Sequence, residues 1–234
     1  MWDNAHLLRG IANVLFGFSV LLMVYGLLRY VAQLPAFSLQ AVVLTATPQR
    51  VDVALLEEVV RDQVRGNFFT VDLAETRAAF QQLPWVRSVS VKRKFPWQLE
   101  VQIEEHIALA RWNKTALVNT YGEVFEAGFD EALPEFTGEQ ENSLVVARMY
   151  GELEQELLPM QRHIVQLDLS PRMAWQVKLD DGMELALGRE AMRERLARFV
   201  KVFPYSVAVR VPNARRIDLR YRNGFAVQAP LGAA

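Results

Sequence analysis

The most constraining feature of the sequence is a helix-ending Leu83-Pro84 pair followed by a long alternating run. Proline cannot continue a helix and favours extended backbone in the residue before it, so we expect a helix to end at Leu83 and a strand to begin at Trp85. From Trp97 to Glu104 apolar and polar residues alternate, which is the period of a strand with one buried and one wet face. A helix followed by a β-hairpin is therefore predicted.

Two amphipathic helices are predicted upstream of this hairpin. Asp52 is placed to cap the first, with Val51 positioned to pack on Leu56. Asp72 is placed to cap the second, whose apolar stripe consists of Leu73, Thr76, Phe80 and Leu83. A strand is expected before them, over residues 37–44. The predicted order is strand, helix, helix, strand, strand.

An uncharged apolar run occupies residues 11–28. As a helix it spans about 27 Å, close to the roughly 30 Å of a bilayer's hydrocarbon layer. We predict a transmembrane helix over residues 11–33 after a short tail of residues 1–10. A cleaved signal peptide is the alternative, but its apolar core is usually shorter and ends at a small-x-small site that residues 30–36 lack. Arg9 and Arg29 flank the run symmetrically, so charge alone does not orient it.

The composition excludes several classes of function. A net charge of -1 argues against a nucleic-acid binder, which needs a concentrated basic excess. The local Lys92-Arg93-Lys94 cluster fits the solvated end of a hairpin better. The chain contains no cysteine, which excludes disulfides, thiolate metal sites and cysteine nucleophiles.

No catalytic or metal-binding constellation stands out in the sequence. The chain has neither a nucleophile elbow nor a phosphate loop. The adjacent carboxylates Glu104-Glu105 point to opposite faces of a strand, and Asp180-Asp181 falls in a predicted turn, so we expect structural roles for both pairs. The histidines are scattered, at His6, His106 and His163. We therefore predict no enzyme activity, no cofactor, no metal site and no small-molecule substrate.

The segment from residue 107 onward predicts a mainly antiparallel sheet with few helices. Its alternating runs predict strands over residues 108–112, 116–119, 124–125, 164–169, 174–179 and 183–187. Its helical spacing predicts helices over residues 143–158 and 189–203.

The last strand of the sequence is charged and lies near the chain terminus. Ile217, Leu219 and Tyr221 alternate with charged residues, and the pattern resumes at Phe225 and Val227 beyond an Asn-Gly pair. Asn-Gly favours a two-residue hairpin, but few residues precede Pro230, so we prefer a single edge strand interrupted by a bulge or kink. Such an edge either accepts a partner's strand or carries arginines that merely prevent aggregation, and the residues alone favour neither.

Several motifs together resemble a known family. Residues 66–72 (Gly-Asn-Phe-Phe-Thr-Val-Asp) and 83–86 (Leu-Pro-Trp-Val) resemble a POTRA domain, specifically that of the FtsQ/DivIB family of bacterial cell-division proteins. Four further segments are similar to that family's second, β domain: Ser170-Pro171-Arg172, residues 175–187, residues 195–204, and residues 217–221 with Asn223-Gly224. The resemblance covers nearly the whole chain.

The resemblance implies an α+β protein with a transmembrane helix, a POTRA domain (β-α-α-β-β) over residues 36–106 and a β domain over residues 107–230. It implies a non-enzymatic divisome scaffold of the inner membrane, with the tail in the cytoplasm, the bulk in the periplasm and enrichment at the septum. A membrane-anchored sensor or envelope enzyme that shares the POTRA module is the alternative.

The resemblance also implies partners and a binding site. The family recruits FtsB and FtsL by strand addition to its last strand, binds earlier division proteins such as FtsK through the POTRA and membrane segments, and acts upstream of FtsW and FtsI. Tyr221 and Phe225 are then expected to be packing anchors, with Arg172 as a candidate to pair with an acidic partner residue. The expected docking residues are Arg220, Tyr221, Arg222, Asn223, Gly224, Phe225, Ala226 and Val227.

Overall fold

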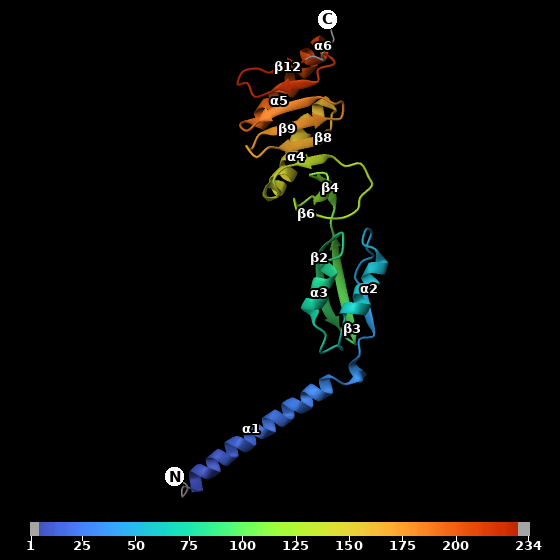
Figure 1. Cartoon of the computed structure of the whole chain (residues 1–234), viewed down its shortest axis with the longest axis vertical. Coiled ribbons are helices and arrows are strands. Elements are labelled where there is room, and N and C mark those ends of the chain that lie inside the picture. Colours follow the sequence, from blue (N-terminus) through green and yellow to red (C-terminus); the bar gives the residue numbers. More distant parts are fainter. Residues whose placement is uncertain (1–4, 229–234) are drawn as a thin grey trace. The chain divides into compact units, whose positions relative to one another are not determined.

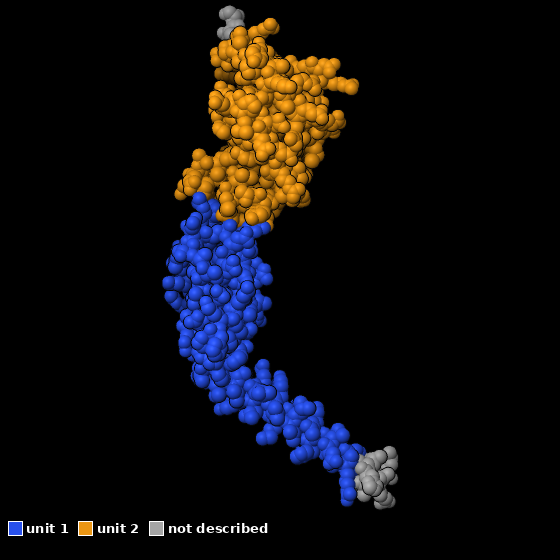
Figure 2. All heavy atoms as spheres, turned by 180° about the vertical axis from the view of Figure 1, so that it is seen from behind, with its two compact units in different colours: residues 1–105 blue, residues 106–234 orange. Residues whose placement is uncertain are grey.

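A computed structural model describes residues 5–228, and Figure 1 traces its helices and strands. The chain divides into two compact units, residues 1–105 and residues 106–234, which Figure 2 colours separately. Residues 1–4 of the predicted tail and residues 229 and 230 of the predicted β domain lie outside the described residues. The α+β architecture is as predicted: an apolar helix, a small mixed module and a sheet-rich module with a few helices.

The chain begins with one long apolar helix, α1 (Ala5–Ala32). Its segment Arg9–Ala32 is 24 residues long, apolar enough to cross a membrane, and not buried by any other part of the described chain. Large apolar side chains such as Phe16 and Met23 are more than 70% exposed. A helix that is apolar all round and uncovered by protein fits a single-pass membrane anchor.

The first unit continues with a three-stranded sheet and two helices. Its elements after α1 are η1 (Pro35–Phe37), β1 (Ala41–Leu44), α2 (Val53–Gln63), α3 (Leu73–Gln81), β2 (Val86–Lys94) and β3 (Gln98–Glu105). The strand β1 is shorter than predicted, because the chain makes a 3-10 turn at Pro35 before it extends. Both predicted caps are present: Asp52 accepts the amide hydrogen of Ala54, and Asp72 accepts those of Ala74 and Glu75.

The strand β3 lies in the centre of this sheet. It pairs parallel with β1 and antiparallel with β2, so the sheet order is β1-β3-β2. The predicted alternation places Leu99 and Val101 in the core, and Phe80 of α3 is fully buried as well. The helix α3 packs against β2, and α2 packs against α3.

The segment between α3 and β2 differs from the prediction, since α3 ends at Gln81 instead of Leu83. Trp85 does not begin the strand, because it has φ +69° and lies in the turn between α3 and β2. The amide of Val86 donates to the carbonyl of Leu83 at 3.2 Å and closes this turn. Burial of the Trp85 side chain, which is 8% exposed and lies under the Arg50 guanidinium, accounts for the unusual backbone at a non-glycine residue.

Glu105, the last residue of β3, holds the loop before α2. Its carboxylate accepts the backbone amides of Gln49, Arg50 and Val51 at 2.8–3.1 Å. Desolvation raises the pKa of Glu105. The hydrogen bonds from the three amides and the charge of Arg50 lower it by more, so the pKa lies below its ordinary value of 4.5. The ionised carboxylate therefore stabilises the folded first unit.

Replacing Glu105 with alanine is expected to lower the free energy of unfolding by about 1–2 kcal/mol at neutral pH, since three amides lose a charged acceptor. Because the folded pKa is depressed, this contribution is present above 4.5 and disappears as the pH falls through the folded pKa. Urea unfolding of the full chain in detergent, at neutral pH and well below 4.5, measures both effects. Glu104→Ala is the matched control, since it removes only exposed side-chain contacts, with Arg87 and Ser88, that contribute little, and it removes no acceptor of a backbone amide. Equal losses in the two variants would contradict the role of Glu105.

The second unit is built on one nine-stranded sheet of order β12-β11-β10-β9-β8-β7-β4-β5-β6. Most pairs are antiparallel, and β4–β7, β7–β8 and β10–β11 are parallel. Its strands are β4 (Ala108–Trp112), β5 (Ala116–Asn119), β6 (Val124–Phe125), β7 (Glu135–Thr137), β8 (Ile164–Leu169), β9 (Trp175–Leu179), β10 (Glu184–Gly188), β11 (Arg216–Asp218) and β12 (Ala226–Gln228). Its helices are η2 (Gln140–Asn142), α4 (Ser143–Leu157), η3 (Leu158–Met160), α5 (Met192–Val202), η4 (Phe203–Tyr205) and α6 (Val207–Arg210).

The core of the second unit lies between this sheet and the two longer helices. The helix α4 packs against β8, α5 packs against β10, and the two helices contact each other. Inward-facing residues of both layers, such as Leu167, Leu185, Leu153 and Phe199, are at most 1% exposed. The sheet-and-helix core therefore extends to β11, whose Ile217 is fully buried, and it positions the chain's last strands.

Candidate protein-binding site

The end of the described chain is a hairpin, which differs from the predicted single edge strand. The strand β11 pairs parallel with β10 on one side and antiparallel with β12 on the other. Residues 219–225 reverse the chain, and neither Asn223 nor Gly224 has a positive φ, so the connection is not a two-residue type I′ turn. The expectation of one strand interrupted at Asn223-Gly224 is therefore wrong.

Packing explains why the chain returns. Phe225 and Val227 are half-buried against the core of the second unit. The rings of Phe225 and Phe199 meet edge to face, with centroids 5.3 Å apart. Burial of these two alternating side chains draws β12 alongside β11, in a register that places Val227 opposite Ile217.

The strand β12 therefore forms the edge at this end of the sheet. The amide of Leu219 donates to the carbonyl of Ala186 of β10, and the amide of Glu184 donates to the carbonyl of Arg215. Ile217, midway between these two residues in β11, therefore directs its backbone groups toward β10. Because these directions alternate along a strand, the even-numbered residues of β11 and β12 face each other. The N–H and C=O of Val227 then point away from β11, and among the described residues no strand pairs with that side of β12.

The predicted docking residues divide between this strand and the segment before it. Of the predicted docking residues, only Ala226 and Val227 are in β12. The strand ends at Gln228, one residue beyond the predicted segment. Tyr221 is 56% exposed and available for contact, whereas Phe225 packs on its own protein instead of projecting as an anchor. Exposed Arg222, Asn223 and Gly224 form the turn, in which the carbonyl of Arg222 accepts a hydrogen bond from Arg198 Nη1 at 2.6 Å.

Arg172 and Arg220 come together around one cavity of about 450 Å³. Arg172 lies in the turn between β8 and β9, which the Ser170 hydroxyl closes by accepting the amide of Ala174 at 3.1 Å. Two arginines that sequence reasoning did not single out, Arg189 and Arg195, also line the cavity, together with a single acid, Glu190. Four arginines line the cavity against one carboxylate, and one of them, Arg220, is paired with Asp218. The remaining positive charge makes this surface suited to an acidic group.

Arg220 is held in place by its neighbours. Its guanidinium donates to both oxygens of Asp218 at 2.6–3.0 Å, which lowers the pKa of Asp218 and raises that of Arg220. Gly188 lies beneath it with φ +80°, and a Cβ there would stand 3.1 Å from Arg220 Cγ. The side chain therefore lies flat over β10 with its guanidinium at the cavity, close to the start of the turn that leads to β12.

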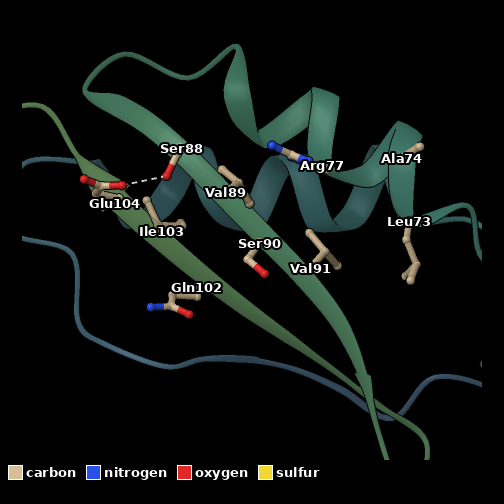
Figure 3. A pocket seen from close by; sticks show the side chains of 10 residues that line it. All are labelled: Leu73, Ala74, Arg77, Ser88, Val89, Ser90, Val91, Gln102, Ile103 and Glu104. Carbon is tan, nitrogen blue, oxygen red and sulfur yellow. Dashed lines mark hydrogen bonds between the residues drawn. The ribbon is translucent and has the colours of Figure 1, made fainter.

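A second free edge occurs in the first unit, where β2 ends the three-stranded sheet. A cavity of about 740 Å³ runs along it, between Leu73, Ala74 and Arg77 of α3 and the residues of β2 and β3 (Figure 3). Ser88 donates to Glu104 across the two strands at 2.8 Å. A groove beside a nine-residue edge strand can hold an extended peptide segment.

Glu104, Glu105 and Asp181 make structural contacts, as predicted for the paired carboxylates. Glu104 binds Arg87 at 2.6 Å, and Glu105 binds three backbone amides. Asp181 accepts the amide of Met183 in the turn before β10 and pairs with Arg162 at 3.4 Å.

Comparisons with known proteins agree with the motifs. The C-terminal model of the cell division protein FtsQ/DivIB matches residues 110–220, and the FtsQ-type POTRA domain model matches residues 37–106. A cell division protein FtsQ from Nitrosospira multiformis is 37% identical over 233 residues, which cover 97% of this chain and 99% of the relative. That of Bordetella pertussis is 36% identical over an alignment of 257 residues, covering 99% and 94%. The chain therefore belongs to the FtsQ/DivIB family of cell-division proteins.

Proposed function

We propose that this protein is a membrane-anchored scaffold of the divisome that recruits other division proteins and catalyses no reaction. The observation that carries the proposal is the outer edge of β12, where the N–H and C=O of Val227 point away from the sheet. A partner strand laid against this edge completes the ladder at little cost, since β11 and the core already hold β12 in place. The partners are FtsB and FtsL, as the family resemblance implies.

The arginine-lined cavity supports the same contact. Arg220 lies in the connection between β11 and β12, and Arg172 lines the same cavity, so one partner can pair with β12 and place an acidic side chain in the cavity. Tyr221, next to Arg220 in the chain, offers an exposed aromatic ring. The docking residues are therefore Arg172 and residues 220–228, and Arg189 and Arg195 add positive charge.

The groove along β2 is the surface that we assign to earlier-arriving division proteins such as FtsK. It lies in the POTRA domain, on the free edge of a long strand, and its polar and apolar lining suits an extended segment. Together with α1, it recruits the chain to the septum, where bound FtsB and FtsL lead on to FtsW and FtsI. The tail then lies in the cytoplasm and both folded units lie in the periplasm.

Fluorescence microscopy of the full chain fused at its N-terminus tests this function directly. In cells depleted of their own FtsQ, the fusion is expected to gather at mid-cell, restore division and bring a labelled FtsB with it. A variant lacking residues 221–228 is the matched control and is expected to reach mid-cell without FtsB. A fusion spread evenly around the envelope would contradict the divisome assignment.

A further inference from the structure

Five aromatic side chains gather at one end of the first unit, and we call them the aromatic cluster: Phe37, Phe68, Phe69, Phe95 and Trp97. Trp97 is at its centre, with ring centroids 5.1–6.1 Å from the other four. The cluster is not a core, because Phe69 is 52% exposed and Phe95 is 78% exposed. A contiguous exposed aromatic patch on a soluble surface marks a contact with something apolar.

The cluster is held rigidly. Arg93 reaches from the end of β2 to the loop of residues 67–71, donating to the carbonyls of Phe68 at 2.6 Å and Val71 at 2.8 Å. Asn67, which is 7% exposed, accepts the amides of Phe69 and Thr70 and fixes the shape of the same loop. The two exposed rings are therefore presented by a fixed scaffold instead of by a mobile loop.

The cluster is also tied to the end of the apolar helix. Asn67 Nδ2 donates to the carbonyl of Ala32, the last residue of α1, at 2.7 Å. Phe37 is five residues beyond Ala32, a stretch that reaches at most about 17 Å. A membrane crossed by α1 ends near Ala32, so the cluster cannot lie far from the lipid headgroups.

Basic residues precede one of the exposed rings in the chain. Lys92, Arg93 and Lys94 are all exposed in the strand end that leads into Phe95. Lys94 has one acidic neighbour, Glu100, at 3.8 Å across an exposed pair that contributes little. Aromatic rings with flanking cations are the combination that favours the interface between the hydrocarbon and the headgroups.

We propose that the aromatic cluster inserts Phe69 and Phe95 into the interface of the bilayer that α1 crosses, with Lys92 and Lys94 on anionic headgroups. This inference rests on the anchoring role proposed for α1. The occupant is a lipid surface and not a protein, because the cluster is fastened to the end of the membrane helix. The first unit is then attached to the membrane at two places.

Depth measurements on the full chain in vesicles of phosphatidylcholine and phosphatidylglycerol test this proposal. The sequence has no cysteine, so one introduced cysteine carries a nitroxide label at a single position. A label at Lys94→Cys is expected to be more accessible to oxygen, and less accessible to a water-soluble nickel complex, than a label at Ala46→Cys. Ala46 is the control because it follows β1 at the opposite end of the parallel β1–β3 pair.

The variant Phe95→Ser separates insertion from folding. This side chain is mostly exposed, so the unit stays folded, but the difference between positions 94 and 46 is expected to shrink. Equal accessibility at both positions, or a difference that Phe95→Ser leaves unchanged, would overturn the proposal. A third label at Gly17→Cys within α1 reports whether the helix is in lipid. A label that is in lipid at position 17 but in water at position 94 would refute the proposed insertion of the cluster alone. A label in water at position 17 would also refute the proposed anchoring by α1.

Discussion

Replacing Val227 with proline is expected to weaken binding of the proposed partners FtsB and FtsL by about thirtyfold to several hundredfold. Proline removes the outward N–H of β12 and leaves one carbonyl of the incoming strand without a donor. The lost hydrogen bond is worth about 1 kcal/mol, the stranded carbonyl costs about 1–3 kcal/mol more, and each 1.4 kcal/mol is a factor of ten in affinity. Titration calorimetry with the purified full chain measures the change.

Two matched variants make this result specific. Val227→Thr keeps the backbone N–H and a β-branched side chain, so its affinity is expected to stay within about threefold of the natural chain. Ala226→Pro removes an N–H that faces β11, so it is expected to lower the stability of the hairpin as well. Val227→Pro is expected to lower thermal stability less than Ala226→Pro does, because it loses part of the packing of Val227 but no hydrogen bond to β11. Unchanged affinity in Val227→Pro would show that the partner binds elsewhere.

Replacing Gly122 with alanine is expected to lower the unfolding free energy of the second unit by about 3–5 kcal/mol. Gly122 has φ +79°, a conformation that strains a residue with a Cβ by about 1–2 kcal/mol. The added Cβ would also stand 2.4 Å from Leu144 Cα, so the helix α4 would have to move. The turn cannot easily shift away, because Ser143 Oγ donates to the carbonyl of Gly122 at 2.6 Å.

Gly182→Ala is the control for Gly122→Ala. Its φ of +85° is similar, but nothing lies within 4 Å of the position of its Cβ. It therefore carries the backbone strain without the clash, and a loss of about 1–2 kcal/mol is expected. Urea unfolding of the two variants, monitored by tryptophan fluorescence, measures the difference. Equal losses would mean that α4 adjusts to the extra methyl group at no cost.

Local signals made much of the fold predictable. The caps at Asp52 and Asp72 and the alternation from Leu99 to Ile103 depend on neighbouring residues, and each is where the sequence indicates. The sequence does not predict the strand β7, because its three residues form a strand only through parallel pairing with β4 and β8, which are distant in the sequence. The turn at Trp85 was missed because burial of a single side chain outweighs the backbone preference.

The candidate site was less predictable for the same reason. The edge itself was expected, but it belongs to β12 because Phe225 packs on Phe199 of α5, a tertiary contact that no local pattern records. Arg172 and Arg220 were expected as separate candidates. Their common cavity, with Arg189 and Arg195, depends on the β8–β9 turn, the end of β10 and α5 meeting at one place.

The parallel pairing of β1 with β3 has a mechanical consequence. The chain enters the POTRA sheet from the membrane helix at the start of β1 and leaves it toward the second unit at the end of β3. Because the two strands run in the same direction, these points lie at opposite ends of the pair. Tension between the membrane and a constricting septum would therefore load all the backbone hydrogen bonds between the two strands in shear at once, instead of breaking these hydrogen bonds one by one.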